Sequence, residues 1–246
     1  SMHHGTRKQV LDYDDVMDKQ RRAIYAERNA ILDGTDTESR AIRHAVDIIG
    51  AIVEETCGGA RRKGERDVDG LNAWVSDMTG DESFDALGLG EGADELADAI
   101  EEVFAERWDA QKGAMGEEAF GDLCRRALLR KLDQHWVDHL VYMDHLKQGV
   151  GLRGLAQRDP LVEYKGEAFD SFRDLVREIY ADFLRTILRL EAEGGVRADE
   201  VAPEKENPFR EENLSYSKSG ESTIQDESDL STMANVTEGT DKEADD

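Results

Sequence analysis

Two apolar stripes of helical spacing dominate the sequence between residues 127 and 190. In the first half, the apolar positions are Leu128, Leu132, Trp136, Leu140, Met143, Leu146 and Val150. In the second half, they are Phe169, Phe172, Val176, Ile179, Phe183, Ile187 and Leu190. Spacing by three or four residues places side chains on one face of an α-helix, and the second stripe is close to an a/d heptad seam. We therefore expect two amphipathic helices that pack on a partner.

The two stripes are separated by the segment GVGLRGLAQRDP. Gly149, Gly151 and Gly154 tolerate a positive φ, and Pro160 cannot continue a helix. Two helices joined by a turn of about ten residues can lie antiparallel and bury their stripes against each other. The sequence thus predicts a helical hairpin whose loop, residues 151–160, lies at its far end.

The N-terminal part predicts two further helices. The first runs from about Thr6 to Leu32 and ends at a break near residues 33–36, and the second ends at Gly58. Their apolar stripes are Val10, Tyr13, Met17, Ile24 and Ile31, and then Ile42, Val46, Ile49 and Val53. Thr35 and Glu38 have the spacing of a capping box. Residues 1–5 resemble an expression scar, and we exclude them from the fold.

Between residues 58 and 116, glycines divide the chain into short segments. A helix is indicated there by Leu96, Ile100, Val103, Phe104 and Trp108. Residues 71–78 suggest a shorter helix, and another helix begins at Glu117 and leads into the hairpin.

The formal net charge is −25, and the last part of the chain is the most acidic. From Asp199 to Asp246 there are 15 acidic and 4 basic residues, hence a charge of −11. Such a segment buries too little apolar surface to fold, so we expect residues 196–246 to be a disordered tail. The negative charge also argues against a nucleic-acid partner, because phosphates would be repelled.

One local motif suggests metal chemistry. His135, Asp138 and His139 approach the H-x-x-E-H spacing of a zinc peptidase family. Asp is shorter than Glu, however, no third ligand is identifiable, and Trp136 lies in the apolar stripe, so we expect no metal.

Cys57 and Cys124 read as small core residues in a reducing compartment. A G-x-x-x-x-G-K-[ST] phosphate loop is absent from the sequence.

Two long motifs carry a family resemblance. The stretch LDQHWVDHLVYMDHLKQGVGLRGLAQRDPLVEYKGEAFDSF resembles the two-helix finger of SecA, the motor ATPase of bacterial preprotein export. The stretch RKQVLDYDDVMDKQRRAIYAERNAIL resembles the start of the long scaffold helix of that family. The resemblance implies an all-α chain that lacks the nucleotide-binding motor. Its expected parts are a scaffold helix (6–57), a helical wing (58–116), a second scaffold part with the finger (117–195) and the tail.

The same resemblance implies a function. In SecA, the finger inserts its loop into the cytoplasmic mouth of the SecYEG channel and contacts the preprotein. The corresponding loop residues are Arg153, Gly154, Leu155, Gln157, Arg158 and Asp159. The first finger helix is a regulator of ATP hydrolysis in the family, and the corresponding positions are Trp136, His139, Leu140 and Met143. Many relatives have Tyr at the position of Leu155.

Partners and location also follow from the resemblance. We expect contacts with the SecA motor domains, SecYEG and preproteins, possible homo-oligomers, and a cytoplasmic protein peripherally associated with the plasma membrane. ATP and Mg²⁺ would belong to the missing motor domains, so the chain alone would hold no cofactor and would not be an enzyme. No Cys follows Cys124 and no His follows His145, so docking of SecB through a zinc module is not expected.

The alternative is a self-contained helical adaptor without catalysis. A scaffold separated from its motor would expose the stripe of Val10, Tyr13 and Met17, so it would self-associate or bind the ATPase core, whereas a free-standing adaptor would be a well-behaved monomer.

Overall fold

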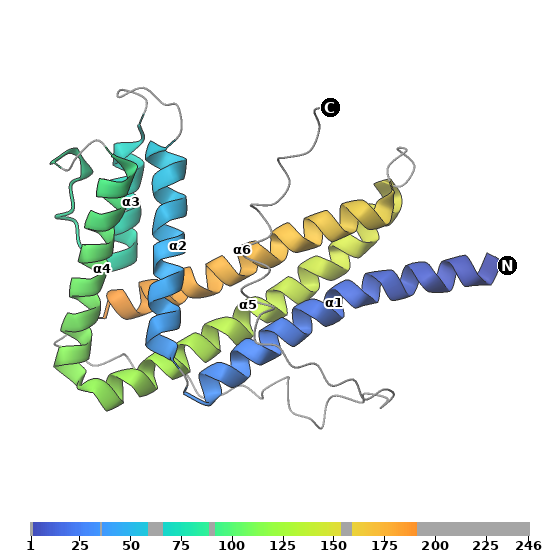
Figure 1. The fold of residues 1–246 in the computed structure, drawn as a ribbon, viewed down its shortest axis with the longest axis horizontal. Helices are drawn as coiled ribbons and strands as arrows, with labels where there is room; N and C mark the ends of the chain where they lie inside the picture. The colour runs from blue at the N-terminus through green and yellow to red at the C-terminus, as the bar shows by residue number, and fades with distance from the viewer. Residues whose placement is uncertain (1, 35, 59–65, 89–91, 154–158, 191–246) are drawn as a thin grey trace, which may run out of the picture. The chain divides into compact units, whose positions relative to one another are not determined.

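The computed structural model describes residues 2–34, 36–58, 66–88, 92–153 and 159–190 (Figure 1). These ranges contain helices, turns and short connections but no strand, which confirms the predicted all-α class. The acidic segment predicted to be disordered lies outside the described residues. None of the described helices is both long and apolar enough to cross a bilayer.

Helices α1 (Met2–Leu32) and α2 (Thr37–Cys57) form the N-terminal part. Helix α1 begins before the expected start and includes residues that we had excluded as a scar. The predicted break is confirmed, since Gly34 and Asp36 adopt positive φ angles of 70° and 62°. The capping box is wrong, because the residue that precedes α2 is Asp36 and Glu38 instead accepts hydrogen bonds from Trp108 and Lys112.

The predicted apolar face of α2 is only half correct. Ile49 and Val53 are buried, but Ile42 and Val46 are 53% and 43% exposed. Helix α2 packs on several helices, including α4 (Ala93–Met115) and α6 (Pro160–Leu188), and its buried residues include Ala41, Ala45, Ile48 and Ile49. The buried face of α2 is therefore rotated away from Ile42 and Val46.

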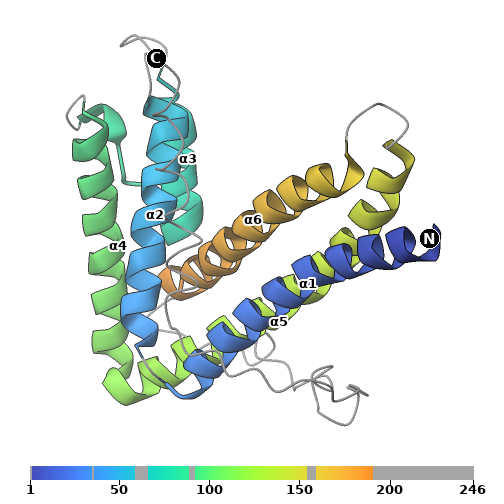
Figure 2. The same ribbon diagram turned by 45° about the vertical axis from the view of Figure 1, so that its right-hand side comes forward.

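Helices α3 (Val68–Thr79) and α4 (Ala93–Met115), with the 3-10 turn η1 (Ala86–Gly88), pack with α2 as a small bundle (Figures 1 and 2). Both predicted helices of this region are confirmed. The Asp67 side chain caps the start of α3 by accepting the Gly70 N–H. The bundle core contains Leu71, Val75, Met78, Leu96, Ile100, Phe104 and Trp108.

Helices α5 (Glu117–Arg153) and α6 (Pro160–Leu188) form the predicted antiparallel hairpin (Figure 1). The loop begins later than expected, because α5 continues through Gly149 and Gly151 to its end. A single glycine in a helix costs only about 1 kcal/mol. Val150 between the two glycines is fully buried, which favours continuation of the helix.

The buried faces of the hairpin match the prediction except at a few positions. Leu140 and Val176 are only half-buried, and Phe169 is 39% exposed. Tyr164 and Ala168 are fully buried on α6 in this region. Phe169 therefore lies outside the seam that it was predicted to begin.

Helix α1 runs alongside α5 (Figure 2) and also contacts α6. Tyr13 and Met17 pack against the hairpin, so the expectation that this stripe is exposed is wrong for them. The side chain of Val10 lies outside the described residues. Cys57 and Cys124 are buried, as expected for core residues, and burial raises the pKa of the Cys124 thiol to about 12.

Candidate functional site

The tip of the hairpin is defined by the two helix ends. Helix α5 ends at Arg153, and α6 begins at Pro160, whose missing N–H needs no partner at a first helical position. The exposed Asp159 caps α6, because its carboxylate accepts the Leu161 N–H at 2.9 Å. Of the predicted loop residues, Asp159 is therefore placed at the tip. The side chain of Arg153, and Gly154, Leu155, Gln157 and Arg158, lie outside the described residues.

An apolar cluster holds the hairpin together next to the tip and includes α1. Its members are Met143, Leu146, Val150, Tyr164 and Ala168, with Tyr13, Val16 and Met17 packed against them. The rings of Tyr13 and Tyr164 meet edge to face, with centroids 4.7 Å apart. Three helices thus share one core near the tip.

The Tyr164 hydroxyl in this cluster is buried without a hydrogen-bond partner among the described residues. Burial raises the pKa of Tyr164 to about 12. Nearby, the Lys147 ammonium lies 3.0 Å from the Asp14 carboxylate and 5.9 Å from the centre of the Tyr13 ring. This ion pair joins α5 to α1 at the surface.

A buried polar layer joins the same three helices further from the tip. The Gln20 amide on α1 donates to the backbone carbonyl of Ala168 at 2.9 Å. The Gln20 carbonyl oxygen lies 3.0 Å from His139 Nε2. His139 Nδ1 lies 3.4 Å from the Ser171 hydroxyl on α6. The layer links α1, α5 and α6 through one glutamine and one histidine.

The contacts fix the tautomer of His139. Because the Gln20 carbonyl oxygen can only accept, Nε2 carries the hydrogen, and Nδ1 accepts the Ser171 hydroxyl. Both Gln20 and His139 are about 95% buried, at 6% and 5% exposed. Burial lowers the pKa of His139 to about 4, so the imidazole is neutral at physiological pH.

The residues predicted to regulate ATP hydrolysis line the inner part of α5. Trp136 is fully buried, and its ring lies 5.6 Å from that of His139. Met143 is also buried, whereas Leu140 is half-buried. Trp136, His139 and Met143 therefore belong to the packing between α5 and its neighbours, and their regulatory role remains a prediction.

A second polar group ties α1 and α2 to α6. The Tyr180 hydroxyl donates to the Glu27 carboxylate, which also pairs with Arg40 at 2.6 Å. The His44 ring of α2 stacks on the Tyr180 ring at 3.6 Å between centroids. Burial, followed by the charge of Glu27, raises the pKa of Tyr180, and burial lowers the pKa of His44. These contacts fix α6 where the hairpin meets the bundle.

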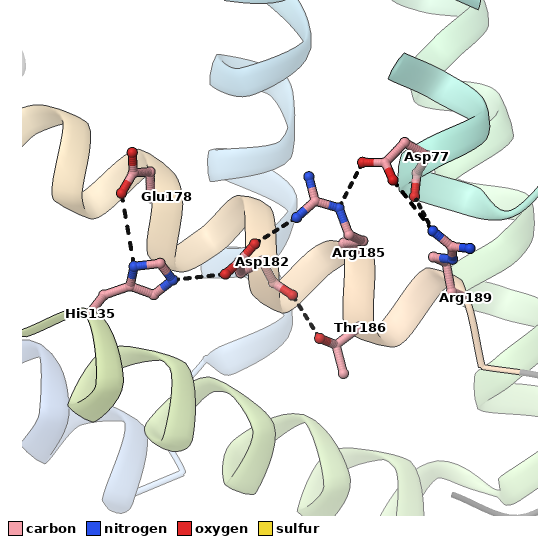
Figure 3. Close-up of polar contacts among 7 residues, drawn as sticks. All are labelled: Asp77, His135, Glu178, Asp182, Arg185, Thr186 and Arg189. Carbon is pink, nitrogen blue, oxygen red and sulfur yellow. Dashed lines mark hydrogen bonds and ion pairs between the residues drawn. The ribbon is translucent and has the colours of Figure 1, made fainter. Parts of the chain in front are cut away.

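The two histidines of the metal-like motif face different partners. His135 lies 2.8 Å from Asp182 and 3.8 Å from Glu178, both on α6 (Figure 3). His139 engages the buried layer instead, and Asp138 is exposed. Within the described residues, no group of three His, Cys, Asp or Glu is placed to hold a metal ion.

From Asp182, a row of ionic contacts continues to α3 (Figure 3). Arg185 pairs with Asp182 at 2.6 Å and with Asp77 of α3 at 2.9 Å. Arg189 donates to the Asp77 backbone carbonyl at 3.1 Å and lies 3.4 Å from its carboxylate. The base of the hairpin is therefore attached to the bundle on this side through one aspartate.

The described groups are suited to holding helices in place. His139 has both ring nitrogens engaged, and the raised pKa keeps the Cys124 thiol protonated, so neither is an activated nucleophile. Sequence reasoning missed Gln20, Tyr180 and Asp77 as contact residues. Only Gln20 left a signal, since it lies three residues after Met17 and four before Ile24, in an otherwise apolar stripe.

Comparison with known proteins places these features in a family. The model of the SecA Wing and Scaffold domain matches residues 1–191. The chain is 36% identical to "Protein translocase subunit SecA 1" of Streptomyces avermitilis, covering 84% of this chain and 23% of that protein. It is 36% identical to the protein of the same name from Mycolicibacterium smegmatis (82% and 22% covered) and 34% identical to "Protein translocase subunit SecA" of Bdellovibrio bacteriovorus (75% and 21% covered).

The chain spans about a fifth of the length of these curated relatives. The matched region includes all the described helices. The chain therefore belongs to the SecA wing and scaffold domain family.

Proposed function

We propose that the chain is the scaffold, wing and finger region of a SecA protein-export motor. In this assignment, residues 6–57 form the scaffold helix, 58–116 the wing, and 117–195 the second scaffold part with the finger. The α5–α6 hairpin would couple ATP-driven motion of the motor domains to preprotein movement through SecYEG. The observation that carries the proposal is a hairpin supported along both of its helices by α1, with its turn at the far end.

Such packing suits the transmission of force. Close-packed helices move as rigid units, because their cores resist compression. A displacement of α1 or of the bundle would therefore be transferred to the tip rather than absorbed between the helices. An apolar contact at Leu155 would bind many unrelated polypeptides, because apolar packing does not require a particular side chain in the partner.

The chain would work as part of a larger enzyme. ATP and Mg²⁺ would be bound by the motor domains and not by this region, and its place would be the cytoplasmic face of the plasma membrane, at the channel. Val137, Val141 and Tyr142 expose apolar surface on α5, the proposed regulatory helix. This surface would contact the motor domains.

Transport by the full-length parent protein tests the proposal. Leu155→Gly should reduce preprotein transport into SecYEG vesicles while the circular dichroism spectrum stays unchanged. The matched control is Leu87→Gly, which changes an exposed leucine of the bundle. Transport that is equal in Leu155→Gly and the control would count against the finger assignment.

A second experiment addresses regulation. The chain is added to a separately expressed motor half, and ATP hydrolysis is measured with and without Val141→Ser, a change on the exposed side of α5. We expect the chain to change the ATPase rate and the variant to weaken that effect. An ATPase rate that does not respond to the chain would contradict a regulatory role and favour the adaptor alternative.

A further inference from the structure

The seam of α1 has a heptad repeat. Its positions in contact with the hairpin include Tyr13, Val16, Met17 and Gln20, and the buried Ile24 and Ile31 continue the seam, so that three pairs (13/20, 17/24 and 24/31) are separated by seven residues. A helix with such a seam presents a similar apolar surface after a shift of one heptad, about 10 Å along its axis. The apolar contacts alone therefore do not select one position of α1 along the hairpin.

The facing seam on α5 has the same character. Its buried positions are Leu132, Trp136, His139, Met143, Leu146 and Val150, spaced alternately by four and three residues. Gln20 shares its heptad position with Glu27, which accepts from Tyr180 of α6, and His139 is the polar member of the α5 seam. Gln20 and His139 meet each other at 3.0 Å. A polar residue at one such position is the device by which coiled coils specify register.

The polar layer satisfies its groups in one register. Gln20 uses its amide N–H toward Ala168 and its oxygen toward His139 at the same time. A shift of seven residues would place Tyr13 or Glu27 opposite His139. The Glu27 carboxylate offers no donor to the Ala168 carbonyl and would bury a charge in the layer. The Tyr13 ring is larger than the amide that it would replace, and overpacking destabilises a core. Both replacements therefore disfavour the shifted state.

We propose that Gln20 and His139 are positioning residues that fix the axial register of α1 on the hairpin. The register sets the position of the tip relative to α1. The buried pair favours one such position from the middle of the seam, and the Asp14–Lys147 and Glu27–Tyr180 contacts agree with it on either side. The inference deepens the proposed function, because a finger that transmits movement needs a fixed length. It concerns only this chain's own helices, so its test needs no transport assay and can fail independently.

The test compares registers by the distance between two spin labels in the full chain. Labels are placed at the exposed positions Lys19 on α1 and Arg130 on α5, which are offset along the helix axes, with both native cysteines replaced by alanine in every sample. The parent should give one distance population. The double variant Gln20→Leu/His139→Leu should give a second population in at least a tenth of the molecules, with a urea midpoint equal to or above that of the parent.

A matched control changes the same seams without touching the polar pair. Met17→Leu/Met143→Leu should keep one population. The double variant Gln20→Met/His139→Met is made in parallel, because methionine adapts its shape to a buried site more readily than leucine does. If a folded double variant, with leucine or methionine at both positions, gives a single unshifted distance population, the proposal is overturned. Failure of both apolar pairs to fold would also overturn it, because the polar pair would then be needed for stability rather than for register.

Discussion

Buried His139 should make folding stability depend on pH in a defined window. Its pKa is about 4 in the folded chain, below the ordinary value of 6.5. Above pH 7 the imidazole is neutral in both states, so its contribution to stability is complete. As the pH falls below 6.5, the unfolded chain takes up the proton first, and the folded state loses stability until about pH 4.

The size of the effect follows from the shift. Each pH unit in this window removes about 1.4 kcal/mol, so the loss between pH 8 and pH 5 is about 2 kcal/mol. Measurements stop at pH 5 because the isoelectric point is about 4.6, where the chain becomes less soluble. Burial also lowers the pKa of His44, which adds a contribution of the same sign.

Urea unfolding of the parent and of His139→Gln, followed by circular dichroism from pH 8 to pH 5, isolates the contribution of His139. The glutamine does not titrate, so the difference between the two free energies of unfolding should change by about 2 kcal/mol over this range. His145→Gln, at an exposed histidine of the same helix, is the control. Parallel curves for His139→Gln and the parent would refute the argument.

Three further changes test the packing by urea unfolding at pH 7.5. Tyr164→Phe should leave stability unchanged or raise it by up to about 1 kcal/mol, because it removes a buried hydroxyl without a partner; a large loss would reveal a partner. Phe172→Ala should cost about 3 to 5 kcal/mol and Phe169→Ala clearly less, since only Phe172 is buried; equal losses would contradict the seam. Asp77→Ala should cost less than about 1 kcal/mol, because its arginine contacts are half-exposed, and a larger loss would show a stronger link between α3 and α6.

Much of the hairpin was predictable because periodicity reports burial directly. Leu128 to Val150 identified one helix face, and six of its seven apolar members are buried. The predicted seam of α6 began at the wrong residue, because Tyr164 and Ala168 were not counted as buried positions. Alanine and tyrosine occur both in cores and on surfaces, so the sequence does not tell whether they are buried. The packing of α1, α5 and α6 shows that Tyr164 and Ala168 lie in the core.

Other features depend on contacts between distant segments. The buried face of α2 includes Ala41 and Ala45 in place of Ile42 and Val46, and an alanine gives no clear sign of burial in a sequence. Glu38 resembled a capping residue but accepts hydrogen bonds from Trp108 and Lys112, some 70 residues away. The partner of Gln20 likewise lies 119 residues away. Contacts with distant residues of this kind decide the role of a polar residue. The local spacing of residues in the sequence does not reveal them.

Site-specific photo-crosslinking at the tip tests the central claim most directly. A photoreactive residue replaces Leu155 in the full-length parent protein, with Leu87 as the control position, during ATP-driven transport of a labelled preprotein through SecYEG. We predict crosslinks from position 155 to the preprotein or the channel that depend on ATP, and none from position 87. Equal absence of crosslinks from both positions during active transport would contradict the proposal that this hairpin is the element that moves the preprotein.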